Sequence, residues 1–179
     1  IKLSDRDKEF VKQTQKSVAE KSITLVRDRA HHFPLDTKKI QKIAVVPITH
    51  HAPALEEAKL LCDELISHGF TVDYFENGIK EPDYKDHDLI IHALFSRPFR
   101  PIGFLDFMDQ QARKISKSFL YGTEKSMVVS FGSPYFGNQY FEKVPTYVNA
   151  YSFLAPSVKA FVRAAVGEIP FTDFSPVQL

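Results

Sequence analysis

Two arginines in a proline-rich segment are the side chains best suited to bind a ligand. The segment is RPFRP, from Arg97 to Pro101. Proline stiffens the backbone, and a guanidinium beside an aromatic ring can clamp a carboxylate or stack on a flat surface. The segment therefore indicates a site for a sugar or an acidic ligand. An ordinary loop, with arginines that are solvated or pair across an interface, remains the alternative.

A serine nucleophile is a second chemistry to test. Ser133 follows an apolar run, which is where a nucleophile elbow would lie. That elbow needs small residues around the serine, but Phe131 lies two positions before it and Pro134 comes next. We therefore expect Ser133 to form a turn.

Adjacent histidines at 31–32 and 50–51 could in principle bind a metal. Neighbouring residues of an extended segment point to opposite sides, and no HExxH motif or cysteine–histidine spacing accompanies either pair. We expect no metal site. The seven glycines form neither GxGxxG nor GxxxxGK[ST], so we also expect no nucleotide cofactor.

Three other histidines have simpler interpretations. His92 lies within an apolar run and is expected to be a hydrogen-bonded core histidine rather than a ligand. His68 and His87 lie beside apolar elements and are expected to be solvated.

Paired carboxyl groups could catalyse hydrolysis if they lay about 5 to 10 Å apart across a cleft. The acidic residues lie instead on expected surface helices, such as Glu56 and Glu57 or Asp106 and Asp109, or in the polar run before residue 88. None has the pattern of an isolated, buried pair. We expect no catalytic residue in this chain.

Composition predicts one globular domain. The chain has 179 residues, of which 44% are hydrophobic and 25% charged. Its 23 basic and 22 acidic residues are interspersed and leave a net charge of +1, which disfavours binding to nucleic acid or anionic lipid. No apolar run reaches the ~18 residues of a membrane span. The single cysteine, Cys62, cannot form an internal disulfide.

Apolar runs alternating with amphipathic segments predict an α/β fold. We expect strands at 43–48, 70–75, 88–95, 127–131 and 147–151, and helices at 5–21, 53–68, 104–121 and 156–166. Residues 22–28 could be a strand or a continuation of the first helix. The continuous apolar runs favour a three-layer α/β/α sandwich with a five-stranded, mostly parallel, doubly wound sheet in the flavodoxin-like order 2-1-3-4-5. Residues 1–41 would be a helix and connecting segment packed on the sandwich of residues 42–179, one domain in all.

Ligands bind at the carboxyl ends of the strands in such sheets. The candidate surface therefore comprises the segments 49–52, 96–103 and 132–138. The ligand-binding candidates on it are Arg97, Arg100, His50, Ser133 and Tyr135.

Six short segments, in this order, resemble a known family. They are SITLVRD at 22–28, FPL at 33–35, KIAVV at 42–46, SFGSPYF at 130–136, NAYS at 149–152, and GEIPF at 167–171 with the later SPVQL. Together they resemble the C-terminal α/β sandwich domain of family-three glycoside hydrolases, and more narrowly the bacterial β-N-acetylglucosaminidase (β-hexosaminidase) branch. The resemblance covers almost the whole chain from about Ser17.

The resemblance implies that the chemistry lies elsewhere. In that family the nucleophilic aspartate, and in this branch an Asp–His acid/base pair, lie on a TIM barrel that precedes the sandwich domain. The HHFPLD segment at 31–36 lacks the glycines of the barrel motif it partly matches. No catalytic residue carries over, and we expect an excised or separately encoded domain whose partner is the barrel of the same parent protein, with carbohydrate bound through the parent. A bacterial parent acting on the cell wall would be wall-associated or secreted, and any other would be cytoplasmic.

Two functions follow. The first is a non-catalytic domain that supports the barrel and rims its sugar cleft; the second is an independent flavodoxin-like module that binds a small sugar or acidic ligand. The first also predicts an exposed aromatic patch for the missing partner. We expect that patch to contain Phe99, Tyr135, Phe136, Tyr140 and Phe141.

Overall fold

The computed structural model describes residues 4–49, 54–75, 83–96, 123–136 and 141–172. Six strands form one sheet in the order β1-β6-β5-β4-β2-β3. Their bounds are Thr24–Asp28 (β1), Lys42–Ile48 (β2), Thr71–Tyr74 (β3), Leu89–Phe95 (β4), Ser126–Phe131 (β5) and Thr146–Asn149 (β6). Every neighbouring pair is parallel except β1 with β6. The predicted mostly parallel sheet and the order of its five expected strands are confirmed.

The sheet has six strands rather than the five predicted. β1 occupies residues whose assignment the sequence leaves open, and it pairs antiparallel with β6 at the edge of the sheet. Its pairing is irregular between Leu25 and Arg27, and most of its side chains are only partly buried. An edge strand of this kind lacks the continuous apolar run that identifies the central strands.

The central strands are buried on both faces. All seven residues of β4 are buried, as are six of the seven in β2. Val45 of β2 is fully buried and lies between Tyr74 of β3 and Ile91 of β4. This double burial explains why the two strands are apolar at successive positions instead of alternating.

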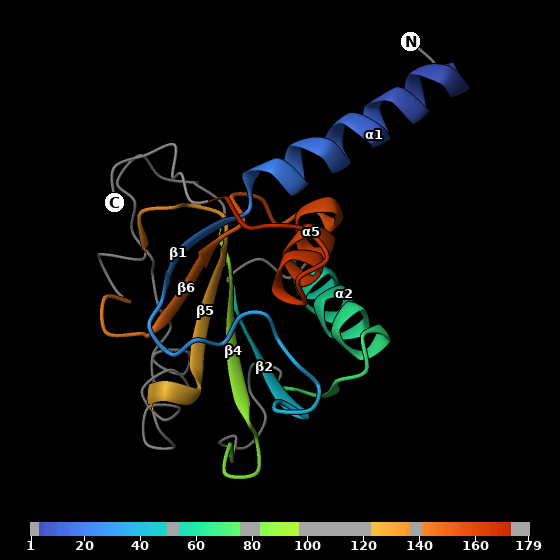
Figure 1. Ribbon diagram of the computed structural model, residues 1–179. Coiled ribbons are helices and arrows are strands. Elements are labelled where there is room, and N and C mark those ends of the chain that lie inside the picture. The colour runs from blue at the N-terminus through green and yellow to red at the C-terminus, as the bar shows by residue number, and fades with distance from the viewer. Residues whose placement is uncertain (1–3, 50–53, 76–82, 97–122, 137–140, 173–179) are drawn as a thin grey trace.

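Two helices cover one face of the sheet. They are α2 (Ala54–Ser67) and α5 (Ala155–Ala165), which lie side by side next to the strands (Figure 1). Their buried residues form one core cluster with alternate residues of β2, β4, β5 and β6. Smaller clusters on the other face contain Phe136, Phe141 and Tyr84. The predicted helix at 104–121 lies outside the described residues.

The helix α1 (Asp5–Ser22) extends away from the sheet (Figure 1). It begins with a capping box: the Asp7 N–H donates to Ser4 Oγ, and the Asp7 carboxylate accepts from the Ser4 N–H. Only its last turns contact α5. Among the helices that the structure describes, none is long and apolar enough to cross a membrane.

The turn after α5 places the Glu168 carboxylate beside α5 and α2. Gly167 has a φ of +83°, which side chains other than glycine rarely adopt. The Glu168 N–H then donates to the Arg163 carbonyl at 2.8 Å, closing the helix end. Glu168 is thereby placed between α5 and the end of α2.

Candidate functional site

The segments that follow β4 and β5 touch at the carboxyl edge of the sheet. A Cβ at Gly132 would lie 2.3 Å from Ser96 Oγ and 2.4 Å from the Ser96 carbonyl oxygen, so only glycine fits without rearrangement. The Ser133 N–H lies 3.4 Å from Ser96 Oγ, to which it donates. Two of the three predicted ligand-binding segments therefore begin in direct contact.

Ser133 forms a turn in this edge, as its neighbours predict. Its carbonyl accepts from Ser130 Oγ at 2.8 Å, and its own Oγ accepts from the Tyr135 N–H at 3.4 Å. Within the described part of the chain, the Ser133 hydroxyl has no hydrogen bond to a histidine that could activate it. Tyr135 is 56% exposed and thus available to a ligand at this edge.

The other three predicted site residues, Arg97, Arg100 and His50, lie outside the described residues. The structure brings Ser133 and Tyr135 together after β5, with the end of β4 next to them in the sheet and the end of β2 one strand further away. The role of all five in ligand binding stays a prediction.

His92 is a core residue, as predicted. It is fully buried in β4, between Val46 of β2 and Val128 of β5. Burial lowers its pKa to about 3, so the ring is neutral near neutral pH. It is therefore unsuited to exchange protons with a substrate.

His87 is buried, and the prediction that it is solvated is wrong. Its side chain is 3% exposed and meets Phe75 and Tyr84 edge to face. Its Nε2 lies 3.0 Å from Asp73 Oδ2, the oxygen that also pairs with Lys42 Nζ at 3.0 Å. Lys42 first, and then His87, lowers the pKa of Asp73. These contacts lie near the amino ends of β2 and β4, away from the carboxyl edge.

The histidine pair at 31–32 has a structural explanation. His32 Nε2 lies 2.7 Å from the Glu124 carbonyl oxygen, and its backbone N–H donates to Asp28 Oδ1. Burial lowers the pKa of His32. Within the described ranges, no group of three or more histidine, cysteine or acidic residues lies close enough together to hold a metal ion.

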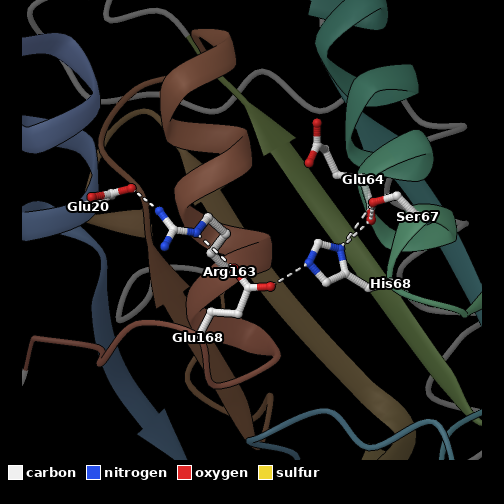
Figure 2. Close-up of polar contacts among 6 residues, drawn as sticks. All are labelled: Glu20, Glu64, Ser67, His68, Arg163 and Glu168. Carbon is white, nitrogen blue, oxygen red and sulfur yellow. Dashed lines mark hydrogen bonds and ion pairs between the residues drawn. The ribbon is translucent and has the colours of Figure 1, made fainter. Parts of the chain in front are cut away.

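A polar cluster that the sequence did not reveal links three helices, as Figure 2 shows. Arg163 of α5 pairs with Glu20 of α1 through Nη1 and with Glu168 through Nε, the latter at 2.9 Å. The other Glu168 oxygen lies 3.1 Å from Nε2 of His68, directly after α2. We call Glu20, Arg163, Glu168 and His68 the three-helix clasp. His68 is thus part of an ion-pair network rather than freely solvated.

Together with the adjacent Ser67, the clasp has the side chains of a serine–histidine–acid triad but not its chemistry. Ser67 Oγ lies 3.2 Å from His68 Nδ1, and His68 Nε2 faces Glu168. However, His68 Nδ1 also lies 2.7 Å from the Glu64 carbonyl, which only accepts, so Nδ1 carries a proton and cannot remove one from Ser67. Both ring nitrogens face acceptors, and this raises the pKa of His68, chiefly through the Glu64 carbonyl. The clasp stabilises an imidazolium and joins the helices.

Several carboxyl groups of the described residues have lowered pKa values, which do not favour acid catalysis. Burial raises the pKa of Asp28, but hydrogen bonds from the N–H groups of His32 and Phe33 outweigh it and lower the pKa overall. The pKa of Asp88 and that of Glu168 are also lowered, by two backbone N–H groups and by Arg163 respectively. A general acid needs a raised pKa to hold its proton near neutral pH.

The prediction of an exposed aromatic patch is wrong for two of its five residues. Phe136 and Phe141 are 4% and 3% exposed and pack in one core cluster with Val144 and Tyr147. They are buried because the loop after β5 and the segment before β6 fold over one face of the sheet. Phe99 and Tyr140 lie outside the described residues, which leaves Tyr135 as the exposed member that the structure describes.

Neither a family model nor a curated protein matches the sequence. Several solved structures, however, are similar to this chain. The chain matches a β-glucoside phosphorylase, BglX, with a TM-score of 0.73 and 25% identity over 94% of this chain and 31% of that one. It matches a family-three β-N-acetylglucosaminidase from Paenibacillus sp. str. FPU-7 with a TM-score of 0.62 and 23% identity, over 94% of this chain and 32% of the other.

A third neighbour is a fungal multi-domain family-three β-N-acetylglucosaminidase with a GCN5-related glucosamine N-acetyltransferase region. The TM-score is 0.69 at 20% identity, and the match covers 91% of this chain and 18% of that one. This chain thus spans less than a third of the length of each of these three neighbours. Its fold is that of one part of multi-domain family-three enzymes.

Proposed function

We propose that this chain is the non-catalytic α/β sandwich domain of a multi-domain glycoside-active enzyme, in which it supports a TIM-barrel catalytic domain. The observation that carries the proposal is the asymmetry of the structural match: 94% of this chain corresponds to 31% of the phosphorylase. Nearly the whole of this fold is therefore a part of longer enzymes. In this proposal residues 1–41 and 42–179 act as one domain.

The chemistry of the described residues supports a non-catalytic role. The shifted carboxyl groups hold lowered pKa values, His92 is neutral in the core, and Ser133 forms a turn without a histidine partner among these residues. Hydrolysis by paired acids requires one carboxyl group that keeps its proton and another that is ionised. A barrel in the parent protein would supply both.

Within the parent, we propose that the carboxyl edge of the sheet rims the sugar cleft. The contact between Gly132 and Ser96 holds two of the edge segments together, and Tyr135 is exposed beside them. Arg97, Arg100 and His50 follow β4 and β2 in the sequence, and the proposal assigns them to the same rim. The six ordered sequence segments favour a β-N-acetylglucosaminidase as the parent, and a cell-wall glycan as its substrate.

The test is a comparison of a barrel with and without this domain. The barrel segment encoded next to this chain would be produced alone, joined to the chain, and mixed with it. We expect the joined and mixed forms to hydrolyse aryl N-acetyl-β-glucosaminides faster than the barrel alone, or to keep their activity to a higher temperature. Aryl β-glucosides, with and without phosphate, would serve as the second substrate because one neighbour is a phosphorylase.

Identical rates and thermal inactivation for the barrel with and without the chain would contradict the support role. The absence of any encoded barrel would contradict the multi-domain proposal and favour the second candidate, an independent module that binds a small sugar or acidic ligand. The strand order favours that candidate, because ligands bind at the switch point of such sheets, here between β2 and β4.

A further inference from the structure

α1 carries an apolar stripe on its surface. Phe10, Val11 and Val18 are 70%, 42% and 61% exposed. Successive residues of an α-helix are about 100° apart around its axis, so these three side chains fall within an arc of about 100°. They therefore lie on one side of α1, where the exposed Thr14 separates Phe10 from Val18, and we call these three side chains the apolar stripe.

The apolar stripe faces away from the domain. α1 contacts the domain through Ala19, which is 4% exposed in the main core cluster, and through Glu20, which pairs with Arg163 of α5. By the same helical rotation, both residues point about 130° away from the middle of the stripe, one to each side. The domain thus holds α1 from one side and leaves the stripe on the other.

Most of α1 has no support from the rest of the described chain. Every residue from 4 to 16 is exposed, and Figure 1 shows this part of α1 extending beyond the body of the domain. An isolated helix of this length is marginal in water even when it is well capped. A helix with exposed Phe and Val side chains in one row is typical of a helix that packs in a groove on a partner.

We infer that the apolar stripe of Phe10, Val11 and Val18 is the surface through which this domain packs against its TIM-barrel partner. The inference rests on the proposed function, and it names the contact that the proposed support requires. It also replaces the predicted aromatic patch at the loop after β5, where Phe136 and Phe141 are buried.

The structural matches favour a domain of the same polypeptide as the occupant. The match to the phosphorylase covers 94% of the 179 residues, so the part left out is shorter than the 18 residues of α1. At least part of α1 therefore belongs to a unit that recurs within a much longer chain. In such a chain, the remaining polypeptide lies within reach of this helix.

A second copy of this chain fits the stripe less well. A phenylalanine buries about 150 to 250 Å² and a valine less, so two paired stripes fall short of the ~1,200 Å² typical of stable interfaces. A barrel can extend the contact beyond the stripe to other surfaces of the domain. The three-helix clasp fixes the last turn of α1 against α5, which sets the direction in which the helix leaves the domain.

The test uses a double variant, Phe10→Ser with Val18→Ser, and a matched control, Glu9→Ser with Lys12→Ser. Glu9 and Lys12 are exposed and lie on the opposite side of α1, so the control changes helix propensity without changing the stripe. The dissociation constant for the separately produced barrel would be measured by isothermal titration calorimetry. We expect the double variant to weaken binding about tenfold or more and the control to change it less than about twofold. Circular dichroism would verify that both variants keep the helix content of the wild-type chain.

Each other outcome overturns the inference in a different way. If the wild-type chain and the double variant bind the barrel equally well, the domain docks through another surface, while the proposed function stands. If the wild-type chain does not bind the barrel at all, the proposed function fails and the inference fails with it. If sedimentation velocity shows a wild-type dimer that the double variant dissociates, the occupant of the stripe is a second copy of the chain.

Discussion

The apolar side chains of β5 and the apolar stripe of α1 lie in opposite environments. All six residues of β5 are buried, and Phe131 at its end stacks on Phe95 at 4.9 Å and meets Phe161 of α5 edge to face at 5.9 Å. Phe10 of α1 is 70% exposed. The sheet is thus a complete core within this chain, whereas α1 presents apolar surface outward. The difference separates a core that is closed among the described residues from a helix with outward-facing apolar side chains, which is the contrast that the proposed contact with a partner domain requires.

Phe131→Ala should cause the largest loss of stability, and it tests whether the core is complete within this chain. The ring contacts both an adjacent strand and α5, so its removal leaves a cavity that the surroundings cannot close. We expect the free energy of unfolding to fall by about 3 to 5 kcal/mol, measured by urea denaturation. A loss below about 1 kcal/mol would show that the face under α5 is loosely packed, and would break the contrast with α1.

Val45→Ala tests an interior strand of the sheet with a smaller deletion. Val45 is fully buried between β3 and β4. Removing its two methyl groups should destabilise the domain by about 1 to 3 kcal/mol. An unchanged denaturation midpoint would contradict the interior position of β2 between β3 and β4.

Phe10→Ser tests the other side of the comparison. Because the side chain is 70% exposed, its replacement in the isolated chain should change the free energy of unfolding by no more than about 0.5 kcal/mol. The loss of stability expected for Phe131→Ala is several times larger, although both changes delete a phenylalanine ring. A loss above about 1 kcal/mol would mean that Phe10 is covered within this chain, which would leave no free stripe for a partner.

The clasp that joins α1 to this core should respond weakly to pH. The raised pKa of His68 means that its contribution to stability is fully present below the unfolded-state pKa of ~6.5 and is lost as the pH rises through the higher folded-state pKa. The wild-type chain should therefore exceed His68→Gln in stability by more at about pH 5.5 than at about pH 9. Equal differences at the two pH values would show that His68 is not held as an imidazolium.

The central strands could be predicted because burial on both faces leaves a direct mark on the sequence. β2 and β4 are apolar at nearly every position, and their order in the sheet follows from right-handed crossovers. β1 could not be assigned from the sequence. This half-buried edge strand mixes apolar and polar residues, as the end of an amphipathic helix also does. The turn at Ser133 was predictable from its neighbours Phe131 and Pro134, because the turn chemistry is local.

Contacts between distant residues left no such mark. The clasp pairs Arg163 with Glu20 across 143 positions, and His68 with Glu168 across 100. Exposure was misjudged for a related reason: Phe136, Phe141 and His87 lie outside the long regular elements, and a position in a loop does not reveal which loops fold over a sheet face. The stripe on α1 had a sequence signal in the spacing of Phe10, Val11 and Val18. Only the contacts of Ala19 and Glu20 show that the stripe points away from the domain.

The most direct test of the central claim is the turnover of the isolated chain. Repurified protein would be assayed with aryl N-acetyl-β-glucosaminides and aryl β-glucosides, with and without phosphate, against an equal amount of the heat-unfolded chain. We expect no turnover above that of the unfolded control, because in the proposed enzyme the catalytic acids belong to the barrel. Turnover that survives repurification and is abolished by a single carboxylate substitution, such as Asp28→Asn, would contradict it.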